Sequence, residues 1–342
     1  MNKILLATTA LVATAGLASA EVALTGSAEM GLADKGDGSS VEFHHDLDVR
    51  FTLSGETDGG LTFGASIDLD ENVGDIGAGS GSHAVFISGG FGTVTLGDTD
   101  GALDWAMTEV AIGSAIADDH STHVGYNGNA GLDGAHDGQV LRYDNTFGDF
   151  GVAVSAELND GDDVSSDDGS ELDTTYGLGL RYNVALAGLD LGLGLGYQTG
   201  AIAFTVADGT GDFGDDDNII KMNADLVGLS VDTTFANGLR AILNYSKGDL
   251  DNNAGDFDHT ALGLGYTSGD LTISANYGEF GKDFDHKGYG VAVNYDLGGG
   301  AVVQFGYGKS DYGSDSQLED SDGNALAGTD NATWSLGLAM SF

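Results

Sequence analysis

Acidic side chains are concentrated in the connection formed by residues 99–137, which contains no lysine or arginine. The residues of this connection that could act on charged solutes are Asp100, Asp104, Glu109, Asp118 and Asp119. A connection of this length within a folded domain usually has a function. Because clustered carboxylates attract cations and repel anions, the chemistry that we predict here is electrostatic.

The arginines of the chain are a second group of candidates. They are Arg50, Arg142, Arg181 and Arg240. Each lies next to an apolar residue in a segment of alternating character, so all four are predicted on the polar face of their segments. On that face they could oppose the carboxylates of connection 99–137 or neutralise carboxylates beside them. The sequence leaves both alternatives open.

Other acidic runs could hold a metal ion. The candidates are Asp162, Asp163, Asp215, Asp216 and Asp217. Their oxygens suit Ca²⁺, but their spacing does not match the EF-hand loop, and a solvated acidic surface is the favoured interpretation. The chain also lacks the G-x-S-x-G, H-E-x-x-H and phosphate-loop motifs. We therefore expect no enzyme and no required cofactor, with Ca²⁺ as a candidate ligand.

Composition excludes further classes of protein. The 342 residues include 54 acidic and 11 basic side chains, 58 glycines, no proline and no cysteine, and the formal net charge is −43. Such a charge excludes a nucleic-acid-binding protein, which must neutralise phosphates. The absence of cysteine excludes disulfides and cysteine-ligated metals.

The first twenty residues resemble a secretory signal peptide. Lys3 precedes an apolar stretch, and Ala18-Ser19-Ala20 provides a cleavage site. We expect residues 1–20 to be removed and residues 21–342 to form one exported domain. No later apolar stretch is long enough to predict a transmembrane helix.

Alternation of apolar and polar residues runs through the rest of the chain and predicts strands. They are expected at 21–33, 42–54, 60–71, 83–89, 91–98, 138–146, 149–158, 173–184, 188–198, 217–235, 239–249, 257–267, 271–281, 286–297, 301–311 and 330–342. Short turns alternate with long connections, as in transmembrane barrels. The prediction is an all-β, antiparallel transmembrane barrel of about sixteen strands. A change of parity between Leu226 and Leu229 suggests a bulge or a misplaced strand end.

The two faces of the predicted barrel differ in chemistry. Charged and amide side chains on the polar face include Asp46, Asp48, Arg50, Lys221, Asn223 and Asp225. Burying them without water would cost several kcal/mol each, so we expect a water-filled interior. Tyrosines near strand ends on the apolar face are Tyr143, Tyr182, Tyr197, Tyr245, Tyr266 and Tyr295. They are typical of the aromatic girdles of a lipid-facing surface.

Three segments together resemble a known family. They are the opening strand Glu21-Val22-Ala23-Leu24-Thr25-Gly26, the stretch Phe91-Gly92-Thr93-Val94-Thr95-Leu96-Gly97 and the terminal Phe342. The chain is similar to the sixteen-stranded general porins of alphaproteobacterial outer membranes, of the Rhodobacter type. The resemblance implies a homotrimer in the Gram-negative outer membrane, in contact with lipid and lipopolysaccharide. It also implies that connection 99–137 folds into the pore as a constriction loop.

The function expected from this resemblance is passive diffusion of ions and small hydrophilic solutes. Asp98 stands where that family often has a basic residue, and with the net charge of −43 it predicts a preference for cations. A substrate-selective channel is one alternative. The other is a secreted, acidic surface-layer or structural β-protein, which the parity of the connections disfavours.

Overall fold

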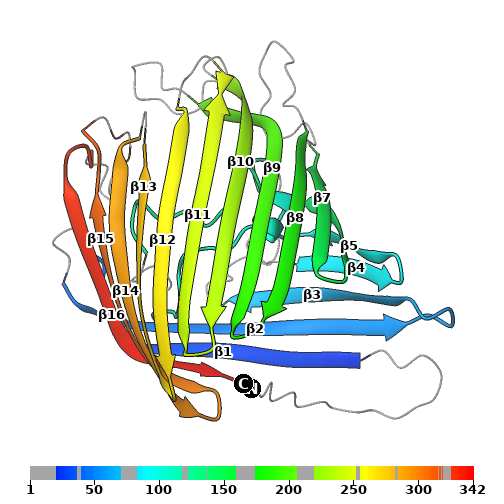
Figure 1. Cartoon of the computed structure of the whole chain (residues 1–342), viewed down its shortest axis with the longest axis horizontal. Helices are drawn as coiled ribbons and strands as arrows, with labels where there is room; N and C mark the ends of the chain where they lie inside the picture. Colours follow the sequence, from blue (N-terminus) through cyan, green and yellow to red (C-terminus); the bar gives the residue numbers. More distant parts are fainter. Residues whose placement is uncertain are drawn as a thin grey trace.

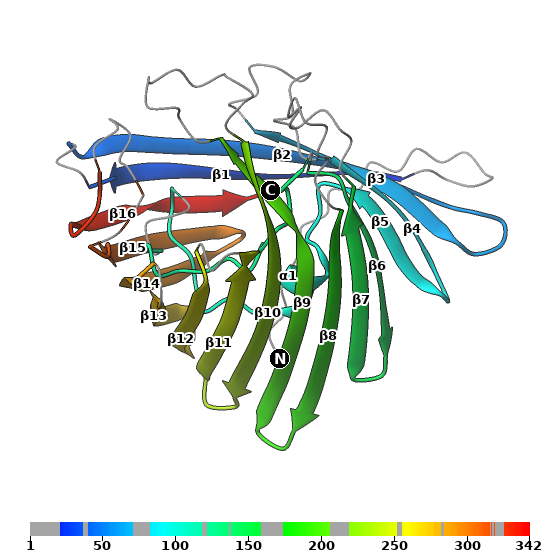
Figure 2. The ribbon, with the colours of Figure 1, turned by 90° about the horizontal axis from the view of Figure 1, so that it is seen from above.

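The computed structural model describes residues 21–36, 40–70, 83–117, 122–136, 138–158, 174–205, 219–251, 255–281, 284–314, 316, 318 and 325–342. In this part of the chain, sixteen strands form one closed antiparallel barrel, in which each strand pairs with its neighbours in the sequence (Figures 1 and 2). The prediction of an all-β barrel is confirmed. Residues 1–20, predicted as a signal peptide, lie outside the described residues.

The strand bounds are close to those predicted, except that the ninth strand was expected to end at 198 and extends to Thr205. They are β1 Glu21–Asp34, β2 Glu42–Glu56, β3 Thr62–Asp70, β4 His83–Gly89, β5 Gly92–Gly97, β6 Val140–Phe147, β7 Phe150–Glu157, β8 Thr175–Leu186, β9 Leu189–Thr205, β10 Ile219–Phe235, β11 Leu239–Leu250, β12 Phe257–Ser268, β13 Leu271–Phe280, β14 His286–Gly298, β15 Ala301–Asp311 and β16 Asp330–Ser341. One short helix, α1 (Ala102–Ala106), was not predicted. No helix among the described residues is long and apolar enough to cross a membrane.

The barrel closes between its first and last strands. Ser27 pairs with Ser341, and the register continues to Asp34 and Trp334. Beyond the end of β16, the backbone N–H of Phe342 donates to the carbonyl of Gly26 at 2.8 Å. Closure gives each of the described strands a partner on both sides, as a sheet in a lipid environment requires.

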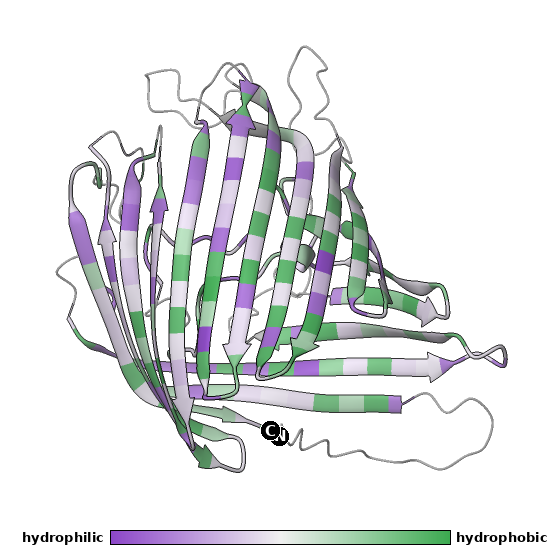
Figure 3. Ribbon diagram, viewed as in Figure 1, coloured by the Kyte–Doolittle hydropathy of each residue, from purple (hydrophilic) through white to green (hydrophobic). Residues whose placement is uncertain are grey.

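The outer face of the barrel is apolar and exposed. Leu195 is 46% exposed, Ile273 48% and Leu264 47%, and green and pale bands alternate along the strands in Figure 3. Monomeric soluble proteins rarely expose such an extended apolar surface. Of the tyrosines predicted here, Tyr182, Tyr197, Tyr245, Tyr266 and Tyr295 are exposed on this face.

The predicted bulge in the tenth strand is wrong. β10 pairs with β9 without interruption from Ile219 and Thr205 to Phe235 and Leu189. Leu226 is 8% exposed and packs inside the barrel with Leu103 and Met107. The alternation of apolar and polar residues changes here because the inward-facing position of Leu226 is apolar, where the inner segment packs against the wall.

The predicted polar face of this strand needs the same correction. Asn223 and Asp225 lie on the exposed side and do not line the interior. The Tyr197 hydroxyl donates to Asp225 at 2.6 Å. The side chain of Lys221 lies outside the described residues. A register shift between neighbouring strands does occur elsewhere, between Asp296 and Gly298.

Candidate functional site

The described residues of the connection between β5 and β6 lie inside the barrel, where α1 is seen behind β9 and β10 in Figure 2. We call residues 98–117, 122–136, 138 and 139 the inner segment. Its outgoing pass follows the wall from β7 to β1. The backbone N–H of Ala102 donates to Ser155 Oγ at 2.9 Å, that of Thr108 to Ser230 Oγ at 3.0 Å, and that of Ala117 to Glu29 Oε2 at 2.9 Å.

The return pass of the inner segment runs back along the wall from β15 to β7. The backbone N–H of Val124 donates to Ser310 Oγ on β15 at 3.0 Å, and that of Leu132 donates to Gln198 Oε1 on β9 at 2.7 Å. The N–H groups of Gly134, His136 and Gly138 all donate to the carboxylate of Glu157 on β7. Two passes of chain therefore cover the wall from β7 to β15, and the outgoing pass continues to β1.

Glycines on the inner face of the wall allow this close approach. A side-chain Cβ at Gly179 would overlap the carbonyl oxygen of Ala102, one at Gly194 that of Ala106, and one at Gly263 that of Val110. On the return pass, Gly278 and Gly308 meet carbonyl oxygens of the inner segment in the same way. The absence of side chains at these positions of the wall therefore leaves room for the backbone of the inner segment.

Apolar side chains of the inner segment complete its attachment. Val110 is 2% exposed and Ile112 8%, and both pack against Ile242 and Ala261 of the wall. Ile116 is fully buried. The lumen is therefore narrowed by a segment that forms part of the protein core, held by apolar burial as well as hydrogen bonds.

Carboxylates gather where the two passes of the inner segment meet near α1. Asp133 accepts from the Gly101 N–H and from Gln198 Nε2, both at 2.7 Å. Burial raises the pKa of Asp133 to about 6. Burial, followed by the negative charges of Asp100, Glu109 and Asp133, raises the pKa of Asp104 to about 7, although Arg181 opposes the shift.

Glu109 is exposed beside this group and accepts a hydrogen bond from the Tyr126 hydroxyl. Together with Asp100, Asp104 and Asp133 it forms a set that we call the acidic cluster. The cluster combines partly buried carboxyl groups, which titrate near neutral pH, with carboxylates open to solvent. This part of the lumen is therefore negatively charged above pH 7.

The arginines take two different roles. Arg142 donates to the carbonyl of Asp100 at 2.6 Å and to Asp144 at 3.1 Å. The guanidinium of Arg181 lies 4.2 Å from the centroid of the Trp105 ring. These two arginines of the wall therefore contact the inner segment beside the acidic cluster.

Arg50 and Arg240 instead pair with carboxylates of the wall. Arg50 donates twice to Asp68 on β3, at 2.5 Å for each bond, and Arg240 donates to Asp232 on β10 at 3.0 and 2.8 Å. Arg50 is 58% exposed and faces open lumen. Arg240 lines a cavity of about 750 Å³ near the short turns. These two arginines therefore neutralise carboxylates beside them and do not oppose the carboxylates of the inner segment.

The structure brings together Arg142, Arg181, Asp100, Asp104 and Glu109. Asp118, Asp119 and the calcium candidates Asp162, Asp163, Asp215, Asp216 and Asp217 lie outside the described residues. Within the described part of the chain, no group of three or more His, Cys, Asp or Glu side chains could hold a metal ion.

Sequence reasoning did not select Glu157, Gln198 and Trp105 as site residues. Glu157 and Gln198 occupy inward positions of alternating strands. The alternation of the sequence indicates that both side chains point into the barrel. It does not reveal that the inner segment contacts them there.

Comparisons with known proteins agree with this architecture. A family model described as "Gram-negative porin" matches residues 7–315. A porin of Rhodobacter capsulatus is 30% identical over 324 residues, which cover 88% of this chain and 98% of that protein. A porin structure refined at 1.8 Å has a TM-score of 0.65 and is 25% identical in sequence, and the match covers 94% of this chain and 100% of that one.

A second solved structure shows likeness of fold alone. The anion-selective porin from Comamonas acidovorans has a TM-score of 0.63 at 15% identity, and the match covers 95% of this chain and 100% of that one.

Proposed function

The chain belongs to the Gram-negative porin family, and from this premise we propose that its outer-membrane channel admits ions and small hydrophilic solutes with a preference for cations. Membership of the family implies a channel rather than an enzyme. It leaves the surface-layer alternative without support. The observation that carries the proposed preference is the acidic cluster on the inner segment, which narrows the lumen.

The charge balance of the lumen supports cation preference. Arg50 and Arg240 are paired with Asp68 and Asp232, so their charges are largely compensated within the wall. Arg142 also has a partner carboxylate, Asp144. Arg181 is left to oppose four carboxyl groups of the acidic cluster. A fold does not determine whether a channel prefers cations or anions. The preference depends on the balance of positive and negative side chains in the narrowed part of the lumen.

The preference can be tested by the reversal potential across a planar bilayer under a KCl gradient. The double variant Asp104→Asn with Glu109→Gln should lower the ratio of cation to anion permeability. Asp225→Asn removes a carboxylate from the outer face and should leave the ratio unchanged. Anion preference in the unaltered protein, or an equal effect of both variants, would contradict the proposal.

We also propose a homotrimer that lies in outer-membrane lipid beside lipopolysaccharide, with residues 1–20 removed on export. Family membership supports the assembly. The Ala-Ser-Ala site directly before Glu21 supports the cleavage. N-terminal sequencing of protein from outer membranes should begin at Glu21, and cross-linking should trap three subunits. A mature chain that begins at Met1, or a monomer alone, would refute the corresponding part.

A further inference from the structure

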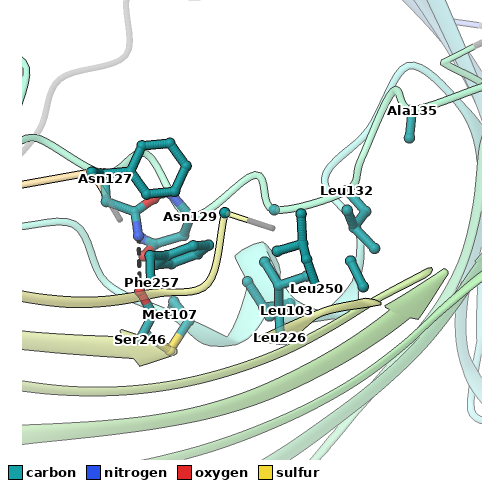
Figure 4. Close-up of a pocket in the computed structure, with 14 residues that line it drawn as sticks. Leu103, Met107, Asn127, Asn129, Leu132, Ala135, Leu226, Ser246, Leu250 and Phe257 are labelled. Carbon is teal, nitrogen blue, oxygen red and sulfur yellow. Dashed lines mark hydrogen bonds between the residues drawn. The ribbon is translucent and has the colours of Figure 1, made fainter. Parts of the chain in front are cut away.

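A cavity of about 490 Å³ lies between the inner segment and the barrel wall, on the side of the long connections (Figure 4). The inner segment contributes Leu103, Met107 and Leu132 to its lining. The wall contributes Leu226, Leu250 and Phe257. A solute that enters from this side reaches the cavity beside the acidic cluster, because α1 contributes residues to both.

The lining of this cavity is unusual for the lumen of a diffusion channel. Apart from Asn127, Asn129, Ser246 and glycine, its lining residues are apolar. Phe257 and Phe284, whose ring centroids lie 6.1 Å apart, offer aromatic edges and faces. Water in such a cavity has few hydrogen-bonding partners, whereas an apolar ring of a solute would bury its surface favourably.

One amide group in the cavity lining has an unused donor. Asn129 is 2% exposed, and its Oδ1 accepts from Asn244 Nδ2 at 2.9 Å. Asn244 Nδ2 also donates to the Thr108 carbonyl at 3.0 Å, which fixes the orientation of both amides. The Nδ2 of Asn129 has no hydrogen-bond partner among the described residues. Leaving a buried donor unpaired is costly, and a hydroxyl group of an occupant could accept its hydrogen bond.

The charge of the surroundings selects the occupant further. The residues that line the cavity include no lysine or arginine. Leu132 is followed directly by Asp133 of the acidic cluster, and the backbone N–H of Leu250, another residue of the lining, donates to Asp256 at 2.9 Å. An anionic occupant would be repelled, whereas an ammonium group at the edge of the cavity would be attracted.

We propose that this cavity binds small ammonium compounds that carry an apolar ring, with the ring among Leu103, Leu226 and Phe257 and the ammonium group toward the acidic cluster. The proposal deepens the proposed function, on which it rests, by naming a class of cation that pauses in the channel. Tyramine is a suitable probe because it combines a ring, a hydroxyl group and an ammonium group. Methylammonium lacks the ring, and 4-hydroxyphenylacetate carries the same ring with a negative charge.

Calorimetric titration of the detergent-solubilised protein tests binding without any requirement for conductance. Tyramine should bind at least about tenfold more tightly than methylammonium or 4-hydroxyphenylacetate, a difference of about 1.4 kcal/mol. Ala224→Leu, at a buried position of the cavity lining, should fill the cavity and weaken tyramine binding by a similar factor. Ala241→Leu adds the same side chain to β11 outside the cavity and should leave binding unchanged.

Channel recordings separate this proposal from the proposed function. Tyramine added on the side of the long connections should interrupt KCl current in a concentration-dependent way, and Ala224→Leu should conduct KCl without these interruptions. Equal binding of all three probes, or unaltered tyramine binding by a folded Ala224→Leu protein, would overturn the cavity proposal. A protein that binds tyramine but conducts no KCl would instead refute the channel.

Discussion

Arg181 on β8 places its guanidinium over the ring of Trp105 on α1, with 4.2 Å between the guanidinium carbon and the ring centroid. The contact joins the barrel wall to the inner segment beside the acidic cluster. An interaction of this kind contributes about 0.5–2 kcal/mol. It therefore helps to determine the position of a charge that faces the channel.

Replacing the ring should loosen this junction. Trp105→Ala should reduce the free energy of unfolding by about 1 kcal/mol or more through the lost stacking, and it should increase single-channel conductance because the ring no longer occupies the lumen. Trp105→Phe keeps an aromatic face and should retain most of both properties. Thermal unfolding in detergent and bilayer conductance measure the two effects. If Ala and Phe variants behave alike, the stacking has no role.

Selectivity should depend on pH through the acidic cluster. Asp133 ionises as the pH rises through about 6 and Asp104 as it rises through about 7, so cation preference should increase between about pH 5 and 8. Asp104→Asn should remove the upper part of this increase. Reversal potentials measured in steps of pH check this expectation. A profile that is flat in the unaltered protein would contradict the assignment.

The same titrations predict a change in stability. Folding raises both pKa values, so the folded chain binds more protons than the unfolded chain between about pH 4 and 7. The contribution of the two carboxyl groups to stability is present at low pH and is lost as the pH rises through about 7. Asp104→Asn should therefore stabilise the protein at pH 8 more than at pH 4, as measured by denaturant unfolding.

Glycine at the wall should be required where the inner segment touches it. Gly194→Ala forces a Cβ against the carbonyl of Ala106 and should cost about 1–3 kcal/mol, as overpacking does. Gly192 lies on the same face of β9, but its nearest neighbour is the flexible end of Asn183. Gly192→Ala should therefore be tolerated. Equal losses of thermal stability in the two variants would show that contact with the inner segment is not the cause.

The return pass should depend on Glu157, which is 1% exposed and accepts three backbone N–H groups. Glu157→Gln removes the charge that strengthens these bonds and should destabilise this end of the inner segment by about 1–3 kcal/mol. Hydrogen exchange at Gly134, His136 and Gly138 should accelerate. Unchanged exchange at these amides would contradict the assigned role of the carboxylate.

Alternation was sufficient to predict the strands because the outer face is apolar along most of them, as Leu189, Leu191, Leu193 and Leu195 illustrate, and the regular sequence of short turns and long connections was needed to predict a barrel. It failed at Leu226 because the inner segment makes the interior apolar there. Helix α1 was missed since five residues cannot display a helical stripe. The resemblance to Rhodobacter-type porins, which the comparisons confirm, was needed to place connection 99–137 inside the barrel.

The partners of individual side chains were beyond the sequence. Gln198 and Asp133 are 65 residues apart, and only the closed barrel brings them into contact. The sequence could predict that all four arginines lie on the polar face of their strands. It could not show that Arg50 and Arg240 are paired within the wall while Arg181 contacts Trp105.

Current through single proteins in a planar bilayer will show whether this barrel is a channel. Purified protein reconstituted in KCl should produce stepwise increases in conductance, in groups of three if the trimer is the functional unit. The same preparation should give a reversal potential of the sign expected for cation preference. Correctly folded protein that inserts into the bilayer and produces no steps would show that the barrel is not an open channel.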